Sequence, residues 1–388
     1  MSNLFLSPAY LAIFVKHIVG GINYAIVNLL FDTKADWQTS SHPPKFKKSI
    51  FMSEINFLSS FVVILPLFIF QLYRFKRDRQ TGSKSAVAPY DLKSALLLVF
   101  PSLIDLVSQA LSLTGNLWIS ASLLVVFKGC RVLFSTVIAR IVLGQRYQGY
   151  HWFGAFLILP AVALYSIGST MSKLHLSSSN HNREVSPLNL QLLGMGLVFI
   201  AELLRAVKAV YEEKMIKCKN MCPKFVAVVE GGLCSILGVF TIMAVHALPG
   251  KEYDEVYGSP IETGSRENFW NTLDWLQHST RVQVLISYLF LTNGLICYFG
   301  FLVTKHLSAV QNSLWSELRI PIVFFTEYVI SLCFSEGFLT PWTGLQIVGF
   351  GLLILAGLIF NGKLKLPIRC LYAEEEIAGC SDMVKPSI

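Results

Sequence analysis

The chain has 388 residues, of which 53% are apolar and only 14% are charged, and its formal net charge is +8. Soluble domains carry roughly 25% charged residues, so this composition excludes an ordinary water-soluble protein, a disordered chain and a disulfide-rich secreted scaffold. The bases fall in short clusters between apolar runs, which favours loops on the cytoplasmic face of a membrane over a nucleic-acid surface. The sequence therefore predicts an all-α polytopic membrane protein.

Apolar runs long enough to span a bilayer occur in ten places, since a helix needs about 20 residues to cross roughly 30 Å of hydrocarbon. In chain order the expected transmembrane helices are 9–31, 50–72, 94–115, 117–139, 150–171, 189–211, 223–247, 282–304, 308–334 and 342–361. Lysine and arginine are concentrated in alternate loops, such as 74–79 and 214–224. Both termini are therefore expected in the cytoplasm.

The loop 249–281 is acidic and contains a segment, 268–277, with Phe269, Trp270, Leu273 and Leu276 on one face at helical spacing. One interpretation is an amphipathic helix in the non-cytoplasmic interface. The other is a packing lid that makes no contact with a substrate.

The sequence repeats weakly with an offset of 190 residues, which aligns the third to fifth spans with the eighth to tenth. The matching pairs are Thr114 and Thr304, Leu117 and Leu307, Phe134 and Phe324, Thr136 and Thr326, Trp152 and Trp342, and Gly154 and Gly344. Halves of five spans each must be inverted relative to one another, as in many secondary transporters; chance similarity of two apolar stretches is the alternative. The expected organisation is a first five-helix repeat at 1–172, a linker at 173–188, a second repeat at 189–362 and a cytoplasmic tail at 363–388.

Charged residues lie within the expected spans, although each costs about 2.5–3.5 kcal/mol at the bilayer centre. They are Lys16, His17, Glu54, Asp105, Lys128, Arg131, Glu202, Arg205, Lys208, Glu230, Glu317, Arg319 and Glu327. Lys128 and Arg131 share one side of the fourth span, and Glu202, Arg205 and Lys208 form one stripe of the sixth.

Two interpretations of these charges remain open. In the first, the bases Lys128, Arg131, Arg205 and Lys208, together with Glu230, bind an anionic solute in a central cavity. In the second, the bases pair with acids between helices. Glu54 and Asp105 are further candidates for carrying a coupling proton, because a desolvated carboxyl group retains its proton more readily.

Enzyme motifs are absent from the sequence. There is no G-x-S-x-G, no phosphate-binding glycine loop, no H-E-x-x-H and no Cys/His set with zinc spacing. We therefore expect a protein that is not an enzyme and that has no cofactor and no metal.

Short segments in both halves carry a family resemblance. They are 100–105 (FPSLID), 115–122 (GNLWISAS), 128–129 (KG), 143–146 (LGQR), 152–154 (WFG), 210–214 (VYEEK), 230–231 (EG), 303–309 (VTKHLSA), 345–350 (LQIVGF) and 361–362 (NG). In these segments the chain resembles the drug/metabolite transporter superfamily, more narrowly the F-type branch of the nucleotide-sugar-transporter-like solute carrier 35 family, which is related to the chloroquine-resistance-type transporters.

The resemblance implies ten transmembrane helices in two inverted five-helix repeats, with a central site that faces cytoplasm and organelle lumen in turn. It also implies that Lys128 takes the position of a fourth-span base in nucleotide-sugar carriers, and that Glu54, Asp105 and Glu230 take positions of intramembrane acids. The sequence departs from the family pattern at four positions, Arg131, Glu202, Arg205 and Lys208, which are usually apolar or neutral.

The leading expectation is a secondary transporter of the endomembrane system, in Golgi or lysosome/endosome, that moves a small anionic metabolite such as a nucleotide-sugar. One alternative is a proton-coupled exporter of amino acids, peptides or cationic metabolites from an acidic organelle. Another is a non-transporting membrane adaptor. The expected partners are a small-molecule solute and membrane lipid, with no nucleic acid, and a homodimer is left open.

Overall fold

The computed structural model describes most of the expected transmembrane part of the chain. The described residues are 8–31, 33, 46, 48–80, 92–116, 121–176, 188–247, 269–320, 322, 324–326, 328–329, 341–365 and 367. Most of the expected linker, most of the expected tail and the acidic part of the loop before residue 269 lie outside this set. Every regular element in the described ranges is an α-helix.

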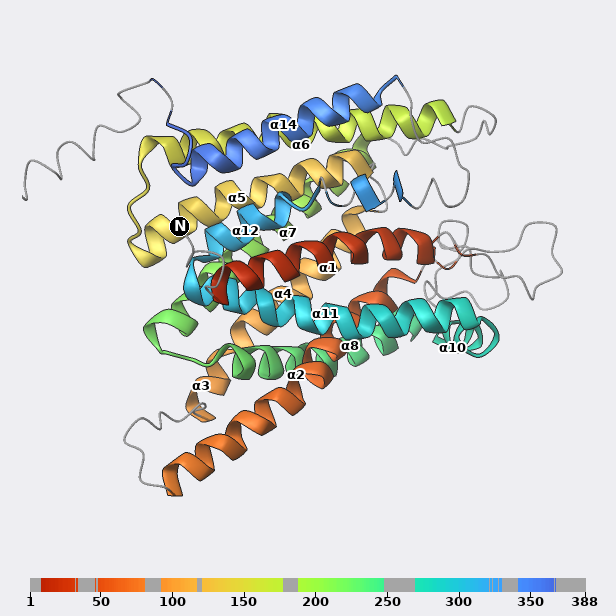
Figure 1. Ribbon diagram of the computed structural model, residues 1–388. Coiled ribbons are helices and arrows are strands. Elements are labelled where there is room, and N and C mark those ends of the chain that lie inside the picture. Colours follow the sequence, from red (N-terminus) through yellow and green to blue (C-terminus); the bar gives the residue numbers. More distant parts are fainter. Residues whose placement is uncertain are drawn as a thin grey trace, which may run out of the picture.

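The helices form a bundle of long, roughly parallel and antiparallel rods (Figure 1). In chain order they are α1 (Pro8–Phe31), α2 (Ser49–Gln80), α3 (Leu92–Leu97), α4 (Val99–Asn116), α5 (Ala121–Leu143), α6 (Gly149–Leu176), α7 (Leu188–Cys218), α8 (Pro223–Ala247), α10 (Phe269–His278), α11 (Thr280–His306), α12 (Ala309–Glu317) and α14 (Thr343–Phe360). In the view of Figure 1, α6 and α14 form one edge and α2 the other, with α5, α12, α1 and α11 between them.

Seven of the described helices are long and apolar enough to cross a membrane. These spans are Leu11–Phe31, Ile50–Asp78, Ala95–Ser112, Gly149–Gly168, Pro223–Ala244, Thr280–His306 and Thr343–Phe360. The sequence prediction had ten, and the other three correspond to α5, α7 and the segment that begins with α12. Those three helices carry several of the charged residues within the expected spans: Lys128 and Arg131 on α5, Glu202, Arg205 and Lys208 on α7, and Glu317 on α12.

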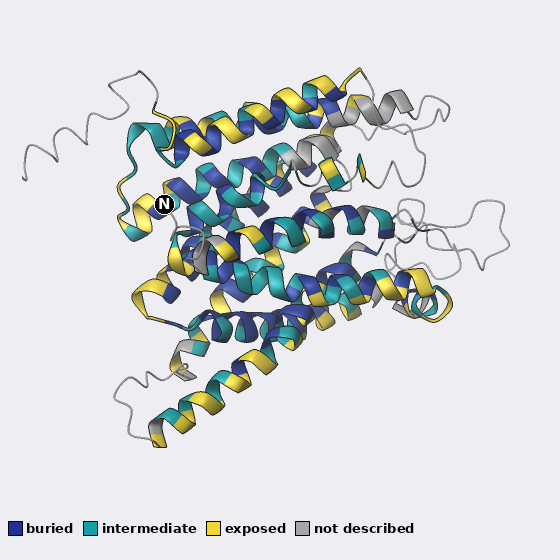
Figure 2. Ribbon diagram, in the orientation of Figure 1, coloured by how far each residue is buried: buried dark blue, intermediate teal, exposed yellow. Residues whose placement is uncertain are grey.

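The outer surface of the bundle is apolar, as a lipid-facing surface requires. Large apolar side chains such as Phe70 on α2, Ile141 on α5 and Val348 on α14 are 65%, 76% and 58% exposed. Figure 2 shows exposed positions running along α2 and α14 at the two edges, whereas α5 and α12 are mostly buried or half-buried. An exposed apolar surface of this extent has no place in water and fits a multi-pass membrane protein.

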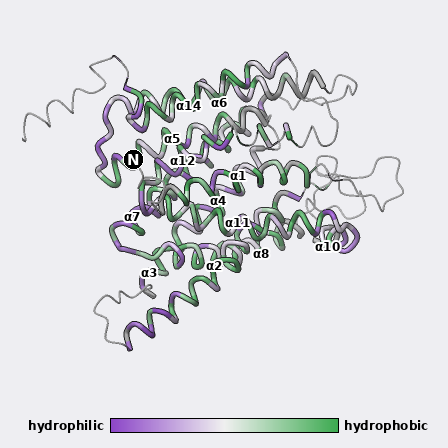
Figure 3. Tube along the Cα trace, in the orientation of Figure 1, coloured by the Kyte–Doolittle hydropathy of each residue, from purple (hydrophilic) through white to green (hydrophobic). Residues whose placement is uncertain are grey.

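The two ends of the bundle differ in polarity. The N-terminal end of α1 and the C-terminal end of α14 lie at the same end (Figure 1). Figure 3 shows hydrophilic residues gathered there and on the projecting C-terminal part of α2. This terminal end holds the connections 144–148, 219–222 and 307–308, with exposed bases such as Arg146 and Lys219.

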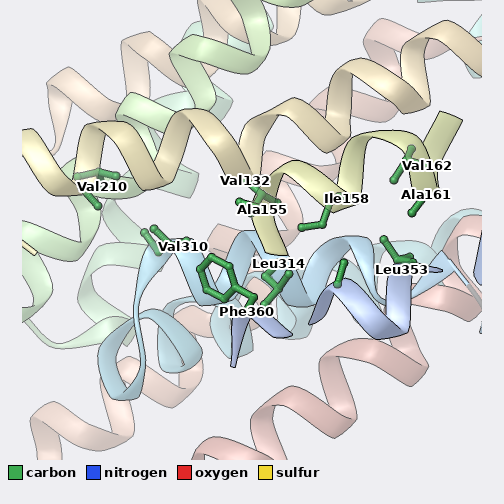
Figure 4. Close-up of a cluster of buried hydrophobic side chains, with 13 residues drawn as sticks. Val132, Ala155, Ile158, Ala161, Val162, Val210, Val310, Leu314, Leu353 and Phe360 are labelled. Atoms are coloured by element: carbon green, nitrogen blue, oxygen red, sulfur yellow. The ribbon is translucent and has the colours of Figure 1, made fainter. Parts of the chain in front are cut away.

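The largest buried cluster joins helices from both halves of the chain. Val132 on α5, Ile158 on α6, Leu314 on α12 and Leu353 on α14 are at most 2% exposed and belong to one core (Figure 4). Val210 extends the cluster to α7. The apolar packing therefore ties the charged helices α5, α7 and α12 to the apolar pair α6 and α14.

Close contact between α6 and α14 depends on glycine. A Cβ added at Gly154 would lie 2.8 Å from Phe360 N, and one added at Gly349 would lie 2.8 Å from Tyr165 N. Glycines at such crossings let membrane helices approach closely. Gly196 and Gly351 lack this role, because a Cβ at either would meet nothing within 4 Å.

The segment α10 confirms the predicted helix at 268–277, but its buried face differs from the expected one. Trp275 is 2% exposed and packs edge-on against Phe46 at a ring-centroid distance of 5.4 Å, whereas Leu273 is 37% exposed. The cluster around Trp275 includes Leu30 and Leu289 of α1 and α11. Trp275, which was not among the four residues of the expected face, therefore anchors the helix to the bundle, and Leu276 of that face packs against the same cluster.

Candidate functional site

The predicted site residues come from five helices, α2, α4, α5, α7 and α8. The stripe expected on α7 is present, because Glu202, Arg205 and Lys208 follow one another at three-residue spacing along a continuous helix. Helix α7 packs against α4 on one side and α5 on another. Its stripe therefore meets Asp105 of α4 and Arg131 of α5.

Glu202 is fully buried and holds two arginines. Arg131 approaches Glu202 Oε2 with Nε at 2.7 Å and Nη2 at 2.5 Å, and Arg205 Nη1 lies 2.6 Å from Glu202 Oε1. One carboxylate thus neutralises one of two guanidinium charges. Charge-assisted contacts of this length are the strongest hydrogen bonds in proteins, and they fix both arginine side chains.

A chain of polar contacts extends from Arg205 across the bundle. Arg205 Nη2 donates to Gln109 Oε1 of α4 at 2.7 Å, and Gln109 Nε2 donates to Ser53 Oγ of α2 at 2.8 Å. The guanidinium position is therefore set from α4 and α2 as well as from α7.

Lys208 lies in a separate group of acids, the Lys208 cluster, made of Lys208, Asp105, Glu212 and Glu230. Lys208 Nζ donates to Asp105 Oδ2 at 2.6 Å and lies 3.2 Å from Glu212 Oε1 and 3.5 Å from Glu230 Oε2. Three of the segments that carry the family resemblance, 100–105, 210–214 and 230–231, supply the acids. The structure thus places Glu230, expected as a substrate contact, beside Lys208.

Lys128 differs from the other three predicted bases. Among the described residues it makes neither a hydrogen bond nor an ion pair. It lies within electrostatic range of Arg131, Arg205 and Glu202. On α12, Glu317 is 8% exposed and lies in the combined field of Arg131 and Lys128.

Residues on α1 and α12 extend the site beyond the set named from the sequence. Lys16 donates to Asn312 Oδ1, and its Nζ lies 3.2 Å from Ser316 Oγ. Arg131 contributes to the electrostatic field at Lys16. The available signal was a lysine inside the first apolar run with two polar residues four apart in the ninth, but nothing in the sequence joins the two segments.

These residues form what we call the cationic centre: Lys16, Lys128, Arg131, Arg205, Glu202 and Glu317. Within the described part of the chain it holds four bases and two carboxylates. Arg131 and Arg205 are only partly buried, since 24% and 16% of their side-chain surfaces are accessible.

Glu54, the other predicted proton carrier, does not lie beside Asp105. It is 8% exposed on α2 and faces α8 near Ser235 and Gly238. Gly238 is eight residues beyond Glu230, about 12 Å along α8. The two predicted proton carriers therefore occupy different depths, and only Asp105 belongs to the Lys208 cluster.

At the terminal end, Glu213 joins three segments that are distant in sequence. Its Oε1 accepts from Gln145 Nε2 at 2.9 Å and from Lys217 Nζ at 2.7 Å, and its Oε2 accepts from Ala309 N at 2.8 Å. Lys217 also donates to Leu307 O. The Glu213 carboxylate thus sits at the N-terminus of α12, where the helix dipole favours a negative charge.

No metal centre is formed by the described residues, since no three of their His, Cys, Asp or Glu side chains converge in a way that would hold an ion.

Several known proteins are similar to this chain over most of its length. No family model matches the chain. Solute carrier family 35 member F6 of Rattus norvegicus is 24% identical over 358 residues, which cover 91% of this chain and 88% of that protein. The Homo sapiens protein of the same name is 24% identical and covers 83% of this chain and 78% of its own length. One crystal structure, 10% identical, is similar in fold with a TM-score of 0.55 and covers 90% of this chain and 95% of its own.

Proposed function

We propose that this chain, which belongs to the solute carrier 35 family, is a secondary transporter that moves a small anionic metabolite across an endomembrane by alternating access. A nucleotide-sugar is the substrate class that the charges fit best, because its diphosphate carries two negative charges. The six residues of the cationic centre carry two positive charges in excess, and Arg319 acts on Lys16, Lys128 and Glu317 as a further base.

The observation that carries this proposal is Lys128, which has no ion pair among the described residues and lies within electrostatic range of the Arg131–Glu202–Arg205 bridge. A base within a membrane-spanning helix that has no ion pair is unfavourable by several kcal/mol unless a ligand or water solvates its charge. Arg131 and Arg205 are held rigidly by Glu202, so they present fixed donors beside Lys128. Preorganised bases of this kind are what phosphate recognition needs.

Alternating access requires two halves of similar structure, and the helix contacts support a ten-helix bundle with inverted repeats. Helix α1 packs against α11 as α7 packs against α4, and α2 contacts α11 as α8 contacts α4. The contacts α2·α8 and α6·α14 pair each helix with its own counterpart. Exchange of the two halves leaves this set of contacts unchanged, as expected if residues 1–172 and 189–362 are repeats.

Lys128→Gln tests the proposal in proteoliposomes that hold the purified full-length protein. Loss of one charge-assisted contact is worth about 1.5–3 kcal/mol, so uptake of the responsive anion should fall by about 10- to 100-fold. The substrates to be tested are nucleotide-sugars, with nucleoside monophosphate inside the proteoliposomes for exchange, and other organic anions. Amino acids serve as the cationic and zwitterionic substrates.

Lys219→Gln is the matched control, because Lys219 is exposed in the connection after α7. It should leave uptake unchanged. Equal uptake of every anion by wild type and Lys128→Gln, at equal protein content, would exclude Lys128 from anion binding. Transport of amino acids or cations alone, with no anion transported, would contradict an anionic substrate and favour the alternative substrate class.

A further inference from the structure

The Lys208 cluster contains more carboxyl groups than its lysine neutralises. Asp105 makes the only hydrogen bond among the three contacts described for Lys208 Nζ, at 2.6 Å. Glu212 and Glu230 lie farther from the ammonium, at 3.2 and 3.5 Å. With all three acids ionised, the cluster would carry two uncompensated negative charges inside the membrane.

Glu230 keeps a buried oxygen without a partner: within the described structure Glu230 Oε1 has no hydrogen bond, and the residue is 4% exposed. Glu212 is 8% exposed, and its Oε1, which makes no hydrogen bond in the described structure, lies 3.2 Å from Lys208 Nζ. Both carboxyl groups approach the same ammonium, so the two groups lie close to one another. Two carboxylates have no proton to donate, so this contact becomes a hydrogen bond only when one of the two groups is protonated.

The neighbouring helices bring no second cation against this pair in the described part of the chain. Helix α4 contributes Asp105, α8 contributes Cys234 and α11 contributes Cys297. On α2 the facing group is the neutral Ser60, which contacts Cys297. The charges of α5 and α12, Arg131 and Glu317, belong to the cationic centre.

We infer that Glu212 and Glu230 form a proton-sharing carboxyl pair, and that this pair, rather than Glu54 or Asp105 alone, carries the coupling proton. The contacts described above support a shared proton on the pair. Coupling of that proton to transport rests on the proposed function.

The position of the pair suits coupling to anion binding. Glu212 is seven residues beyond Arg205, about 10 Å along α7, and Asp105 links the two groups because it pairs with Lys208 and also acts electrostatically on Arg131 and Arg205. An anion in the cationic centre adds negative charge near the pair and so favours its protonation. Linkage is reciprocal, so a proton on the pair favours anion binding, and anion and proton travel together.

Infrared spectroscopy of the full-length protein in lipid tests proton binding without any substrate. At neutral pH we expect a carboxylic-acid C=O stretch in wild type that disappears in Glu212→Gln and in Glu230→Gln and persists in Glu54→Gln. Both glutamine variants should melt no lower than wild type, because they remove surplus carboxylate and keep the side-chain shape. A band that survives both substitutions, or one lost in Glu54→Gln, would overturn the assignment.

Transport in proteoliposomes tests coupling. Glu212→Gln and Glu230→Gln should abolish the stimulation of anion uptake by an inward proton gradient but retain anion exchange at equal pH on both sides. Asp274→Asn, at a side chain of α10 that is 47% exposed, is the control and should keep both activities. Unchanged proton stimulation in the variants, or stimulation by a sodium gradient in place of protons, would contradict coupling through the pair. No flux of any anion in wild type would contradict the transport function and leave the infrared result standing on its own.

Discussion

At the residue scale, Glu202 decides whether the bases of the cationic centre are tolerated. It is fully buried and contacts both Arg131 and Arg205 within 2.7 Å. The two guanidinium groups depend on this one carboxylate, since the other described contacts of Arg205 are to neutral groups. Removing Glu202 would therefore leave two enclosed charges without an ion pair.

Glu202→Ala should lower the free energy of unfolding by about 3–5 kcal/mol, the usual penalty for leaving one partner of a buried ion pair unmatched. The measurement is thermal denaturation of the purified protein in detergent at fixed protein and lipid concentration. The triple variant Arg131→Met, Glu202→Leu, Arg205→Met should recover most of this loss, because apolar replacement of a whole buried network is often neutral. It should not recover anion uptake. A triple variant as unstable as Glu202→Ala would show that the network stabilises the bundle beyond mutual neutralisation.

At the scale of elements, glycine sets the separation of α6 and α14. Gly349→Ala should lower the free energy of unfolding by about 1–3 kcal/mol, as overpacking does, because the new methyl group would lie 2.8 Å from Tyr165 N and 2.9 Å from Ala161 O. Gly351→Ala, two residues along the same helix with open space around it, should be neutral or slightly stabilising. Melting temperatures of the two variants measure the difference, and equal melting temperatures would contradict close contact at Gly349.

Element boundaries show how far sequence reasoning reaches. The seventh expected span, 223–247, coincides with α8 at both ends, because a proline and a long apolar run mark it. The second span, expected to end at residue 72, continues as helix to Gln80, since Arg74, Lys76 and Arg77 are helix formers that project past the bundle into a polar region. The apolar run marks the part of α2 expected within the membrane, whereas the helix itself extends beyond that part.

The ion-pair partners of the charged residues could not be predicted from the sequence. The three-residue spacing placed Glu202 and Arg205 on one stripe, and that pair lies within its own helix. Arg131 and Glu202 are 71 residues apart and Lys208 and Asp105 are 103 apart, so their pairing depends on helix order and on the rotation of each helix. The sequence therefore located the charged residues and left open which of them pair.

At the scale of the whole molecule, the exposed bases of the terminal end lead us to predict that this end faces the cytoplasm. Cys218 is exposed at that end, at the C-terminus of α7. In a variant that retains Cys218 as its single cysteine, a membrane-impermeant maleimide should label it in cells whose plasma membrane alone is permeabilised. Asp274→Cys in a cysteine-free background should be labelled only after the organelle membranes are dissolved. The reverse pattern would invert the topology.

The Glu213 contacts bear on how such a bundle opens at the terminal end. The Glu213 carboxylate accepts hydrogen bonds from the connection between α5 and α6, from the Lys217 ammonium and from the first turn of α12. A movement of this carboxylate would therefore break all three contacts together. Under the proposed transport function, this end of the bundle would therefore open as one unit, since the three contacts depend on the same carboxylate.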